Sequence, residues 1–254
     1  MTAKICSFNL RAPFDNDGFN HFNNRKGRIA EIIFEHAPDL IGFQECREEP
    51  RVWLDEILRG KYTVLGCGRE ADLTGESTSI AYKTNEYSLI SLDNIWLSGT
   101  PDVPGSTYGG DQSRCPRMFT AARLVHNKSL ARFVFVNTHL DHEGKNARLL
   151  GAMQITQWIS RADLPFILTG DMNAQPSSEP VSVFLNNAAR QVVDTTSLIT
   201  STFHGFGKLK TPNKIDYIFT DMPSNPLRSF AVEDNPADGL YISDHNPVFA
   251  FVEI

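Results

Sequence analysis

The stretch RFVFVNTHLDHEGKNARLLGAMQITQWISRADLPFILTGDMN, residues 132–173, decides the fold because it alternates strand-like and helical patterns. The runs Arg132–Thr138 and Pro165–Leu168 are apolar and contain aromatic or β-branched residues, which favours strands. Between them, residues 146–160 carry apolar side chains at helical spacing. Polar groups follow both runs, His139-Leu140-Asp141-His142 after the first and Gly170-Asp171-Met172-Asn173 after the second. The stretch therefore combines buried strands with potential catalytic groups at their ends.

Similar short runs dominate the rest of the chain. The pattern predicts further strands at Lys4–Asn9, Leu40–Phe43, Tyr62–Leu65, Ser79–Tyr82, Tyr87–Trp96, Thr120–Val125, Ile215–Phe219, Leu227–Val232 and Val248–Val252. It predicts helices at Asn24–His36, Pro50–Leu58 and Glu179–Asn187. Many short strands with few helices between them predict an α+β fold, a four-layer α/β/β/α sandwich of two packed mixed sheets flanked by helices.

Two features of the chain bear on its organisation. No repeat, low-complexity tract or long Pro/Gly/Ser linker divides it, so we expect one domain over residues 1–254. The segment 98–116 is rich in Gly, Pro, Ser and Asp, and a loop of this length inside a compact domain is usually functional or mobile. Its composition permits closure over a substrate.

Polar side chains stand at the ends of several predicted strands, not only in residues 132–173. If those ends meet at one edge of the sandwich, they form a site with four carboxylates, two imidazoles and two amides, from Asn9, Glu45, His139, Asp171, Asn173, Asp216, Asp244 and His245. Crowded carboxylates cannot all stay ionised without a cation. Oxygen ligands of this kind suit Mg²⁺ or Mn²⁺, which favour phosphoester hydrolysis.

The charge balance limits the partners of such a site. The chain carries 24 Lys and Arg against 30 Asp and Glu, a formal net charge of -6. Because phosphate contacts along nucleic acid need a basic surface, strong binding of duplex DNA is not expected. A nuclease is not excluded, since bound divalent cations offset carboxylates locally. The sequence does not give the oligomeric state.

The cysteines and the amino terminus indicate the compartment. The four cysteines, Cys6, Cys46, Cys67 and Cys115, form no CxxC pair and have irregular spacing, which is typical of free thiols in a reducing compartment. No signal peptide is visible, and no apolar run approaches the ~20 residues of a membrane span. We therefore expect a cytoplasmic protein without a membrane span.

Six fragments in order resemble the endonuclease/exonuclease/phosphatase superfamily, which has the DNase I-like fold. They are Ser7-Phe8-Asn9, Gln44-Glu45, Asn137-Thr138-His139, Gly170-Asp171-Met172-Asn173, Ile215-Asp216-Tyr217 and Ser243-Asp244-His245, and together they cover nearly the whole chain. Four more stretches, Phe8–Arg11, Trp96–Ser98, Asn137–His142 and Thr202–Phe206, resemble a bacterial branch of stand-alone members near the nocturnin-like group.

The resemblance implies a role for each matching residue. Glu45 would be the principal metal ligand, with Asn9 and Asp244 near or sharing the metal. Asp171 would orient or deprotonate the attacking water, and Asn173 and His139 would hold the phosphoryl oxygens. His245 would contact the phosphate, with its imidazole oriented by Asp216; such a pair favours the imidazolium and phosphate binding.

Four further residues are candidates for substrate binding. Arg117 is one because a guanidinium matches phosphate oxygens, although a surface ion pair is the alternative. Phe206, beside His204 in a Gly-containing loop, could stack on a ring of the substrate or simply pack, and Tyr108 in the long loop is similar.

Three hypotheses about function follow. The first is a Mg²⁺-dependent phosphoesterase, foremost a phosphodiesterase, acting on a small molecule or a short single-stranded nucleic acid. The second is a phosphomonoesterase acting on a nucleotide, sugar or inositol phosphate. An open groove on both sides of the metal favours a diester, and a closed basic pocket favours a monoester. The third is a catalytically silent binding module, and the intact set of polar strand ends argues against it.

Overall fold

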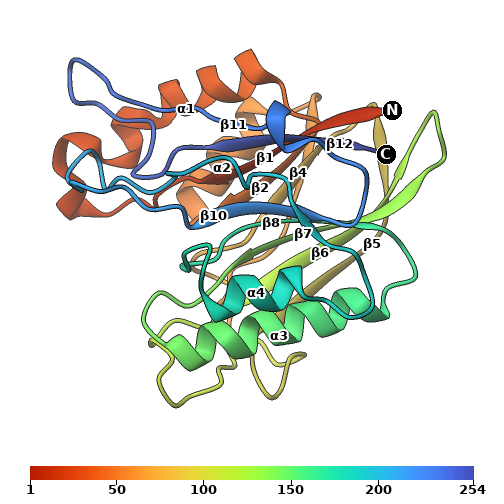
Figure 1. Cartoon of the computed structure of the whole chain (residues 1–254). Helices are drawn as coiled ribbons and strands as arrows, with labels where there is room; N and C mark the ends of the chain where they lie inside the picture. Colours follow the sequence, from red (N-terminus) through yellow and green to blue (C-terminus); the bar gives the residue numbers. More distant parts are fainter.

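Two six-stranded sheets lie face to face, and two helices cover the outer face of each (Figure 1). The computed structural model describes residues 1–254. The first sheet has the order β11 (Phe230–Ala231), β12 (Val248–Glu253), β1 (Thr2–Asn9), β2 (Leu40–Gln44), β4 (Ile80–Lys83), β3 (Tyr62–Leu65). The second has the order β5 (Tyr87–Trp96), β6 (Met118–His126), β7 (Arg132–His139), β8 (Phe166–Asp171), β10 (Asp216–Thr220), β9 (Val193–Asp194).

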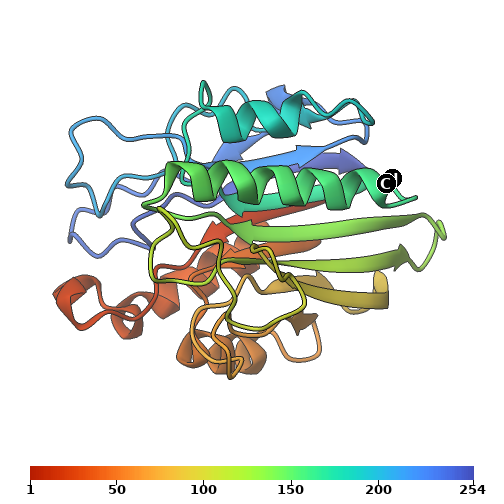
Figure 2. The same cartoon turned by 90° about the horizontal axis from the view of Figure 1, so that it is seen from below.

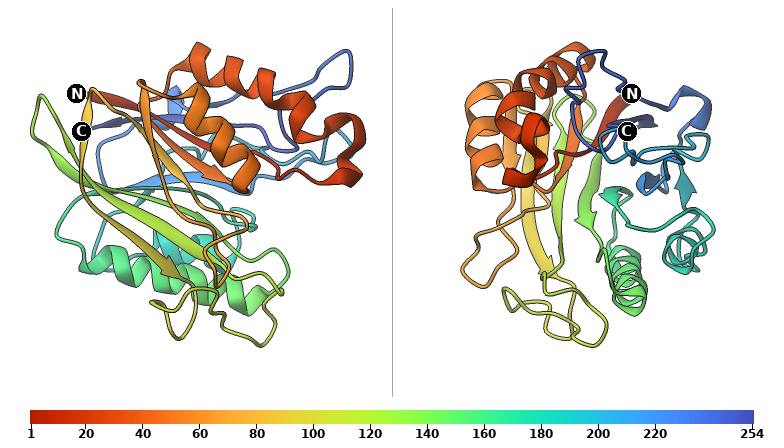
Figure 3. Two further views of the ribbon diagram at one scale, coloured as in Figure 1. Left: turned by 180° about the vertical axis from the view of Figure 1, so that it is seen from behind. Right: turned by 90° about the vertical axis from the view of Figure 1, so that its left-hand side faces the viewer.

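The helices complete the four layers. The helices α1 (Phe22–His36) and α2 (Glu48–Ile57) lie on the first sheet, and α3 (Lys145–Arg161) and α4 (Glu179–Leu185) lie on the second. Figure 2 shows α3 and α4 across the second sheet, and the right-hand view of Figure 3 shows the two helix pairs on opposite sides of the molecule. This arrangement confirms the predicted α/β/β/α sandwich.

Three apolar clusters fill the spaces between the four layers. The middle cluster joins the two sheets, with Ile5 and Ile80 of the first sheet against Phe133 and Ile218 of the second. The outer clusters pack the other faces of the sheets on their helices, for example Ile29 of α1 in one and Ile155 of α3 in the other. Because each sheet buries both faces, its strands are more continuously apolar than a half-exposed sheet would be.

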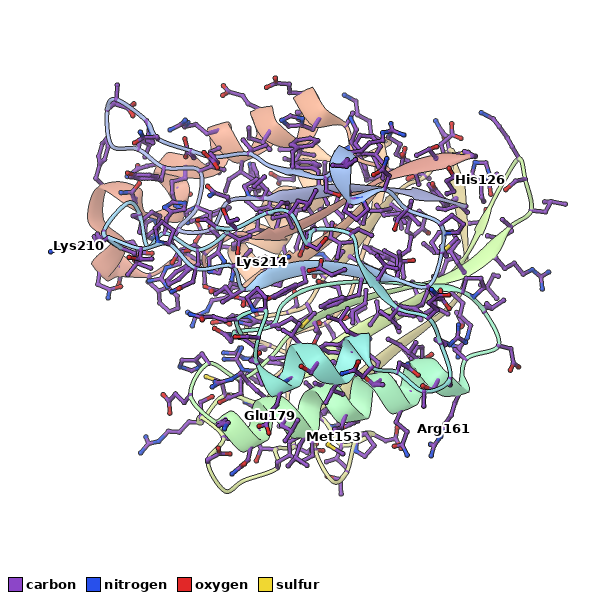
Figure 4. All side chains as sticks on the ribbon, viewed as in Figure 1. His126, Met153, Arg161, Glu179, Lys210 and Lys214 are labelled. Carbon is purple, nitrogen blue, oxygen red and sulfur yellow. The ribbon has the colours of Figure 1, made fainter.

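Parallel strand pairs place the carboxyl ends of several strands at one edge of the sandwich. In the first sheet β1 pairs in parallel with β2, and in the second β7 pairs in parallel with β8; each pair is joined through a helix. The termini lie together at the opposite end, where β1 pairs with β12 and Ile254 N donates to the Met1 carbonyl at 2.7 Å. In Figure 4, His126 marks this end of the molecule, and Lys210 marks the loop before β10 at the other end.

A polar cluster joins the two sheets below the edge where those strands end. The Gln44 side chain donates to Asn137 Oδ1 at 2.7 Å, and Asn137 Nδ2 donates to the carbonyl of Phe43 at 2.7 Å. A Cβ at Gly42 would lie 2.0 Å from Thr169 Oγ1, so only glycine permits this close approach of the sheets. The polar cluster fixes β2 against β7 and β8.

The predicted elements hold for most of the chain, with one clear error. The predicted strand Leu227–Val232 is wrong: residues 226–228 form a 3₁₀ turn, and only Phe230–Ala231 pairs with β12. Pro226 cannot donate a ladder hydrogen bond, which keeps this edge segment out of the sheet. The predicted helix to Asn187 ends at Leu185, and the short β9 and the 3₁₀ helix Asp15–Asn20 were not predicted. No helix has the length and apolar character needed to cross a membrane.

Candidate active site

The strand register brings the predicted catalytic groups together at one edge of the sandwich. His139 ends β7 directly beside Asp171, the last residue of β8, in the parallel ladder. Asp171 in turn lies opposite Asp216, the first residue of β10, in the antiparallel ladder. Side chains of directly opposed residues project from the same face of a sheet, so the register alone makes these three groups neighbours.

Asp216 and His245 form the predicted carboxylate–histidine pair. His245 Nδ1 lies 2.9 Å from Asp216 Oδ2, and the backbone N–H of Asp216 is held by Thr202 Oγ1 at 3.1 Å. Burial alone would lower the pKa of His245, but the charge of Asp216 outweighs it and raises that pKa to about 10. His245 is therefore an imidazolium at neutral pH, and its Nε2 lies 3.7 Å from Asp171 Oδ2.

Asp171 is buried between Asn9 and Asp216 at the end of β8. It is 2% exposed, and its oxygens accept hydrogen bonds from Asn9 Nδ2 at 3.0 Å and from the Asn173 backbone N–H at 2.9 Å. Burial and the nearby charge of Asp216 raise the pKa of Asp171 above the usual value of a carboxyl group. A carboxylate with a raised pKa accepts a proton from water more readily than an ordinary one.

Glu45 directly follows β2 and stands beside Asn9 at the end of β1. Its oxygens accept from Asn9 Nδ2 at 3.1 Å and from the Ala12 backbone N–H at 3.0 Å. Burial raises its pKa, but the Ala12 hydrogen bond and the charges of His245 and Arg11 outweigh this effect, so the pKa of Glu45 is lowered. Glu45 is thus held as a carboxylate.

The two other predicted metal ligands are placed differently. Asp244 lines a pocket at this edge of the sandwich, with Oδ2 3.6 Å from Arg11 Nη1. Burial raises the pKa of Asp244 despite the charge of His245. Asn9 directs its Nδ2 at Glu45 and Asp171, while its Oδ1 accepts from the Arg11 backbone N–H at 2.9 Å. In this arrangement Asn9 acts as a donor that spaces two carboxylates, and its role as a metal ligand stays a prediction.

Left-handed backbone conformations mark the same edge. Arg11, Glu45 and Asn173 have φ values of 54°, 56° and 46°. Such conformations are uncommon for residues other than glycine, and they collect at functional sites where the surrounding structure holds them. Here each turn redirects the chain immediately after a strand, so the side chain faces the pocket.

The donor set fits a hard divalent cation. Glu45, Asp171 and Asp244 line one pocket, and Asp216 lies directly behind it. The pKa values of Asp171 and Asp244 are raised in the absence of a compensating cation, and carboxylate oxygens are the ligands that Mg²⁺ and Mn²⁺ prefer. One group of three potential ligands, Asp171, Asp216 and His245, lies within 4.8 Å, but its histidine is already engaged with Asp216.

His139 and Asn173 border the same space. The pKa of His139 is lowered well below its usual value, first by burial and then by the charges of Arg117 and Arg69. The ring is therefore neutral, with Nε2 3.5 Å from Asp171 Oδ2. Asn173 anchors its amide by donating to the Leu140 carbonyl at 3.0 Å.

The pocket at this edge has a volume of about 370 Å³ and two chemically different parts. The acidic end consists of Glu45, Asp171 and Asp244. The arginine wall consists of Arg47, Arg69 and Arg117, together with the carboxylate of Glu76, and it continues the pocket beyond His139. Both parts line one concavity, so a bound molecule can contact them simultaneously.

Of the predicted substrate-binding residues, only Arg117 lines the pocket. It is 4% exposed, and its guanidinium lies 2.7 Å from His142 Nδ1 and 3.4 Å from Asp141 Oδ2. Asp141 itself accepts from the Ser113 and Gly144 backbone N–H groups, so it anchors the loop that carries Arg117.

The other three lie outside the pocket, so the structure does not support the stacking considered for Phe206 and Tyr108. Tyr108 packs against α3, where its hydroxyl donates to Gln154 and lies 3.3 Å from the Leu150 carbonyl. His204 accepts from the Gly207 N–H and lies against the Tyr241 ring. Phe206 lies 5.7 Å from the guanidinium of the buried Arg25.

Several pocket residues were not predicted. Phe203, three residues before Phe206, lines the pocket and packs on the His245 ring at 4.7 Å. Phe14 lies at the rim between the guanidiniums of Arg11 and Arg47, at 4.6 and 4.7 Å. Arg69 and Glu76 come from the loop between β3 and β4, where no strand end marks them in the sequence.

Arg25 of α1 supports the site from behind. This residue is fully buried, and its guanidinium donates to the carbonyls of Leu10 at 3.0 Å, Arg11 at 2.9 Å and Ile242 at 2.5 Å. These carbonyls belong to the segments that carry Asn9 and Asp244. Arg25 therefore joins two distant chain segments next to the acidic end through hydrogen bonds to backbone rather than through an ion pair.

The four-layer fold with buried acids and histidines at the strand ends defines a phosphoesterase fold of the DNase I type. Residues 6–245 match the model of the Endonuclease/Exonuclease/phosphatase family, and the chain belongs to that family. This confirms the resemblance drawn from the six sequence fragments.

Solved structures agree with this assignment. An endonuclease/exonuclease/phosphatase from Bacteroides vulgatus is 28% identical with a TM-score of 0.92, covering 100% of this chain and 99% of that one. The mannosyl-6-phosphatase Bt3783 of Bacteroides thetaiotaomicron is 27% identical with a TM-score of 0.88, covering 99% and 100%. The human nocturnin catalytic domain shares the fold, with 18% identity, a TM-score of 0.74 and coverage of 99% and 94%.

Proposed function

We propose that the chain is a Mg²⁺- or Mn²⁺-dependent phosphoesterase that hydrolyses a phosphomonoester of a small molecule. The size and the basic lining of the pocket carry this proposal. The acidic end and the arginine wall line one concavity of about 370 Å³. Pockets of this size hold small ligands, and guanidiniums bind phosphate oxygens. The sequence alone had favoured a diester, and this basic pocket moves our preference to a monoester.

In this proposal Glu45 and Asp244 hold the cation, with Asn9 fixing the Glu45 carboxylate. A bound Mg²⁺ or Mn²⁺ would polarise a phosphoryl oxygen and offset the charge of the crowded carboxylates. Glu45 suits the role because it is partly exposed to the pocket, stays ionised and projects from a turn at the end of β2.

The protein groups then position an in-line attack by water on phosphorus. Asp171 orients the water and accepts its proton, for which its raised pKa is suited. The imidazolium of His245, held by Asp216, stabilises negative charge on the phosphoryl oxygens, and Asn173 and neutral His139 border the same space. The leaving oxygen departs toward the interior of the pocket and takes a proton from solvent.

A phosphorylated sugar is the first substrate class to test. The similar Bacteroides thetaiotaomicron protein is a mannosyl-6-phosphatase, and the two chains align over nearly their whole lengths. The polar lining of the pocket, including Arg69, Glu76 and Arg117, is suited to a polar leaving group.

The second candidate is a phosphodiester with a small second ester group. The aromatic rings of Phe14 and Phe203 at the pocket favour this alternative, because a nucleobase can stack on such rings. We do not propose duplex DNA as a substrate, given the net charge of -6.

The four free cysteines support a reducing, cytoplasmic location.

The test compares a chromogenic phosphomonoester with a chromogenic phosphodiester in Mg²⁺, in Mn²⁺ and with chelator. Monoester hydrolysis that chelator abolishes and added metal restores supports the proposal. Diester cleavage alone would move the assignment to the second candidate. Failure of both substrates, followed by failure of a panel of sugar and nucleotide phosphates, would support a binding module instead.

A further inference from the structure

The arginine wall contains two buried guanidiniums that each keep one nitrogen without a hydrogen-bond partner. Arg69 and Arg117 are 7% and 4% exposed. The unbonded nitrogens are Arg69 Nε, which lies 3.7 Å from Glu70 Oε1, and Arg117 Nη1. Burying a charged donor without an acceptor is unfavourable, and such groups in native structures call for a specific reason.

Another buried arginine of the chain is bonded more completely. Arg25 donates to four carbonyls, and the half-buried Arg190 donates to the carbonyls of Leu164 and Ala162 and to Asp221. The fold is thus able to saturate a buried guanidinium where its role is structural. The unused donors of Arg69 and Arg117 coincide with the wall of the pocket.

An acceptor stands beside these donors. Glu76 is 8% exposed and lies with Oε2 2.8 Å from Arg69 Nη1 and Oε1 3.5 Å from Arg47 Nη2. Its carboxylate lines the same pocket. The wall therefore offers a carboxylate acceptor next to guanidinium donors, and the charge of Glu76 is already balanced by its two arginine neighbours.

This combination selects one kind of ligand group. A second phosphate or a carboxylate on the substrate would be attracted by the arginines, but it can only accept hydrogen bonds and so cannot use the Glu76 carboxylate. A hydroxyl both donates and accepts, so neighbouring hydroxyls can donate to Glu76 and accept from Arg69 or Arg117 at no charge penalty. The small void behind Arg69, Arg117 and His139, about 10 Å³, is too small for a ligand group.

We propose that Arg69, Glu76 and Arg117 form a subsite for neighbouring hydroxyls on the leaving group, which selects sugar or polyol phosphates over simple alkyl and bisphosphorylated substrates. This inference rests on the proposed function, because it places the phosphoryl group at the acidic end. From there the leaving group extends past His139, which lines both the pocket and the void behind the two arginines. The subsite is a matter of substrate selection and adds no chemical step.

The experiment measures kcat and KM for mannose 6-phosphate, n-hexyl phosphate and mannose 1,6-bisphosphate in Mg²⁺. The wild-type enzyme should prefer mannose 6-phosphate over n-hexyl phosphate by about 100-fold in kcat/KM, as expected when a site hydrogen-bonds hydroxyls that the analogue lacks. Glu76→Gln and Arg69→Lys should reduce this preference at least about 10-fold, mainly through KM for the sugar phosphate.

A matched control separates substrate selection from loss of folding. Asp221→Asn removes the carboxylate charge of a half-buried ion pair, that of Arg190 and Asp221, neither of which lines the pocket. It should leave the ratio between the sugar and alkyl substrates unchanged. Thermal unfolding of all variants shows whether each is folded at the assay temperature.

Three results would overturn the inference. An equal loss on both monoesters in Glu76→Gln and Arg69→Lys would show that the wall serves the phosphoryl group. Preference of the wild type for mannose 1,6-bisphosphate, strengthened by Glu76→Gln, would show a subsite for an anion. Equal activity of the wild type on sugar and alkyl monoesters would show no selection of hydroxyls, while activity on neither monoester would contradict the proposed function itself.

Discussion

The two parts of the pocket are built in different ways. The acidic end stands on strand ends whose positions are set by ladder register, and its side chains are interlocked: Asn9 joins Glu45 to Asp171, and Asp216 holds His245. The arginine wall stands on loops, and its buried donors are left partly unbonded. Under the proposed function, the sheets fix the groups that act on phosphorus, whereas loops supply the groups that contact the rest of the substrate.

The largest effect is expected at Glu45. Glu45→Gln keeps the shape of the side chain but removes the charge that we assign to metal binding, so kcat/KM should fall by about 10³-fold or more. The variant should also lose the increase in melting temperature that Mg²⁺ gives the wild type. The exposed Glu143→Gln is the control, and retention of the Mg²⁺ effect in Glu45→Gln would contradict the metal-ligand assignment.

Asp171→Asn should separate proton transfer from metal binding. Loss of the general base should lower kcat by about 10² to 10⁴-fold. Because Glu45 and Asp244 remain, the stabilisation by Mg²⁺ should persist, and calorimetric titration of Mg²⁺ into the variant measures this. A variant that loses metal binding altogether would instead place Asp171 among the metal ligands.

A smaller effect is expected at Asp216, which acts through another residue. Asp216→Asn should lower kcat about 10 to 100-fold, as is typical for a group that orients a functional histidine. The readout specific to this role is the ¹⁵N chemical shift of the His245 ring, which should change toward the neutral form because the neighbouring carboxylate is gone. An unchanged His245 spectrum would show that Asp216 does not set its protonation.

At the arginine wall we expect changes in KM rather than in kcat. Arg117→Lys keeps the charge but loses the planar donor geometry, so KM for a sugar phosphate should rise about 10-fold with kcat changed much less. Steady-state kinetics on mannose 6-phosphate tests this. A fall in kcat with constant KM would mean that Arg117 acts on the transition state and belongs functionally with the acidic end.

The smallest effect is expected at Tyr108, outside both parts of the pocket. Tyr108→Phe removes the hydroxyl that contacts Gln154 and Leu150, which should lower the free energy of unfolding by about 1 kcal/mol and leave kcat/KM within about twofold. Urea denaturation and the monoester assay measure the two quantities. A substantial rise in KM would show that the loop contacts the substrate after all.

The comparison also explains what the sequence could reveal. Asn9, Glu45, His139 and Asp171 were predicted because each ends or follows an apolar strand, and parallel strands bring such ends to one edge. The four-layer fold was predictable for the same reason, since the strand periodicity persists along the chain. These features depend on local pattern and on ladder geometry.

Of the arginine wall, only Arg117 was predicted, from the chemistry of its side chain and not from a strand end. The positions of Arg69 and Glu76 depend on the fold of the loop after β3, which carries no strand or helix pattern. Phe206 was considered and Phe203 overlooked because the choice between them depends on which ring the loop turns toward His245. The error at Leu227–Val232 is of the same kind, since Phe230 and Val232 pack at an edge without extended pairing and Leu227 is exposed.

The pairing of β1 with β12 has a consequence for how the protein becomes active. Asn9 ends the first strand, and Asp244 and His245 directly precede the last one, so these groups meet only when the two ends of the chain come together. Contacts this distant in sequence form late and slow folding. During synthesis, the pocket cannot be assembled before β12 has left the ribosome, so a product that ends before Asp244 lacks part of the acidic end.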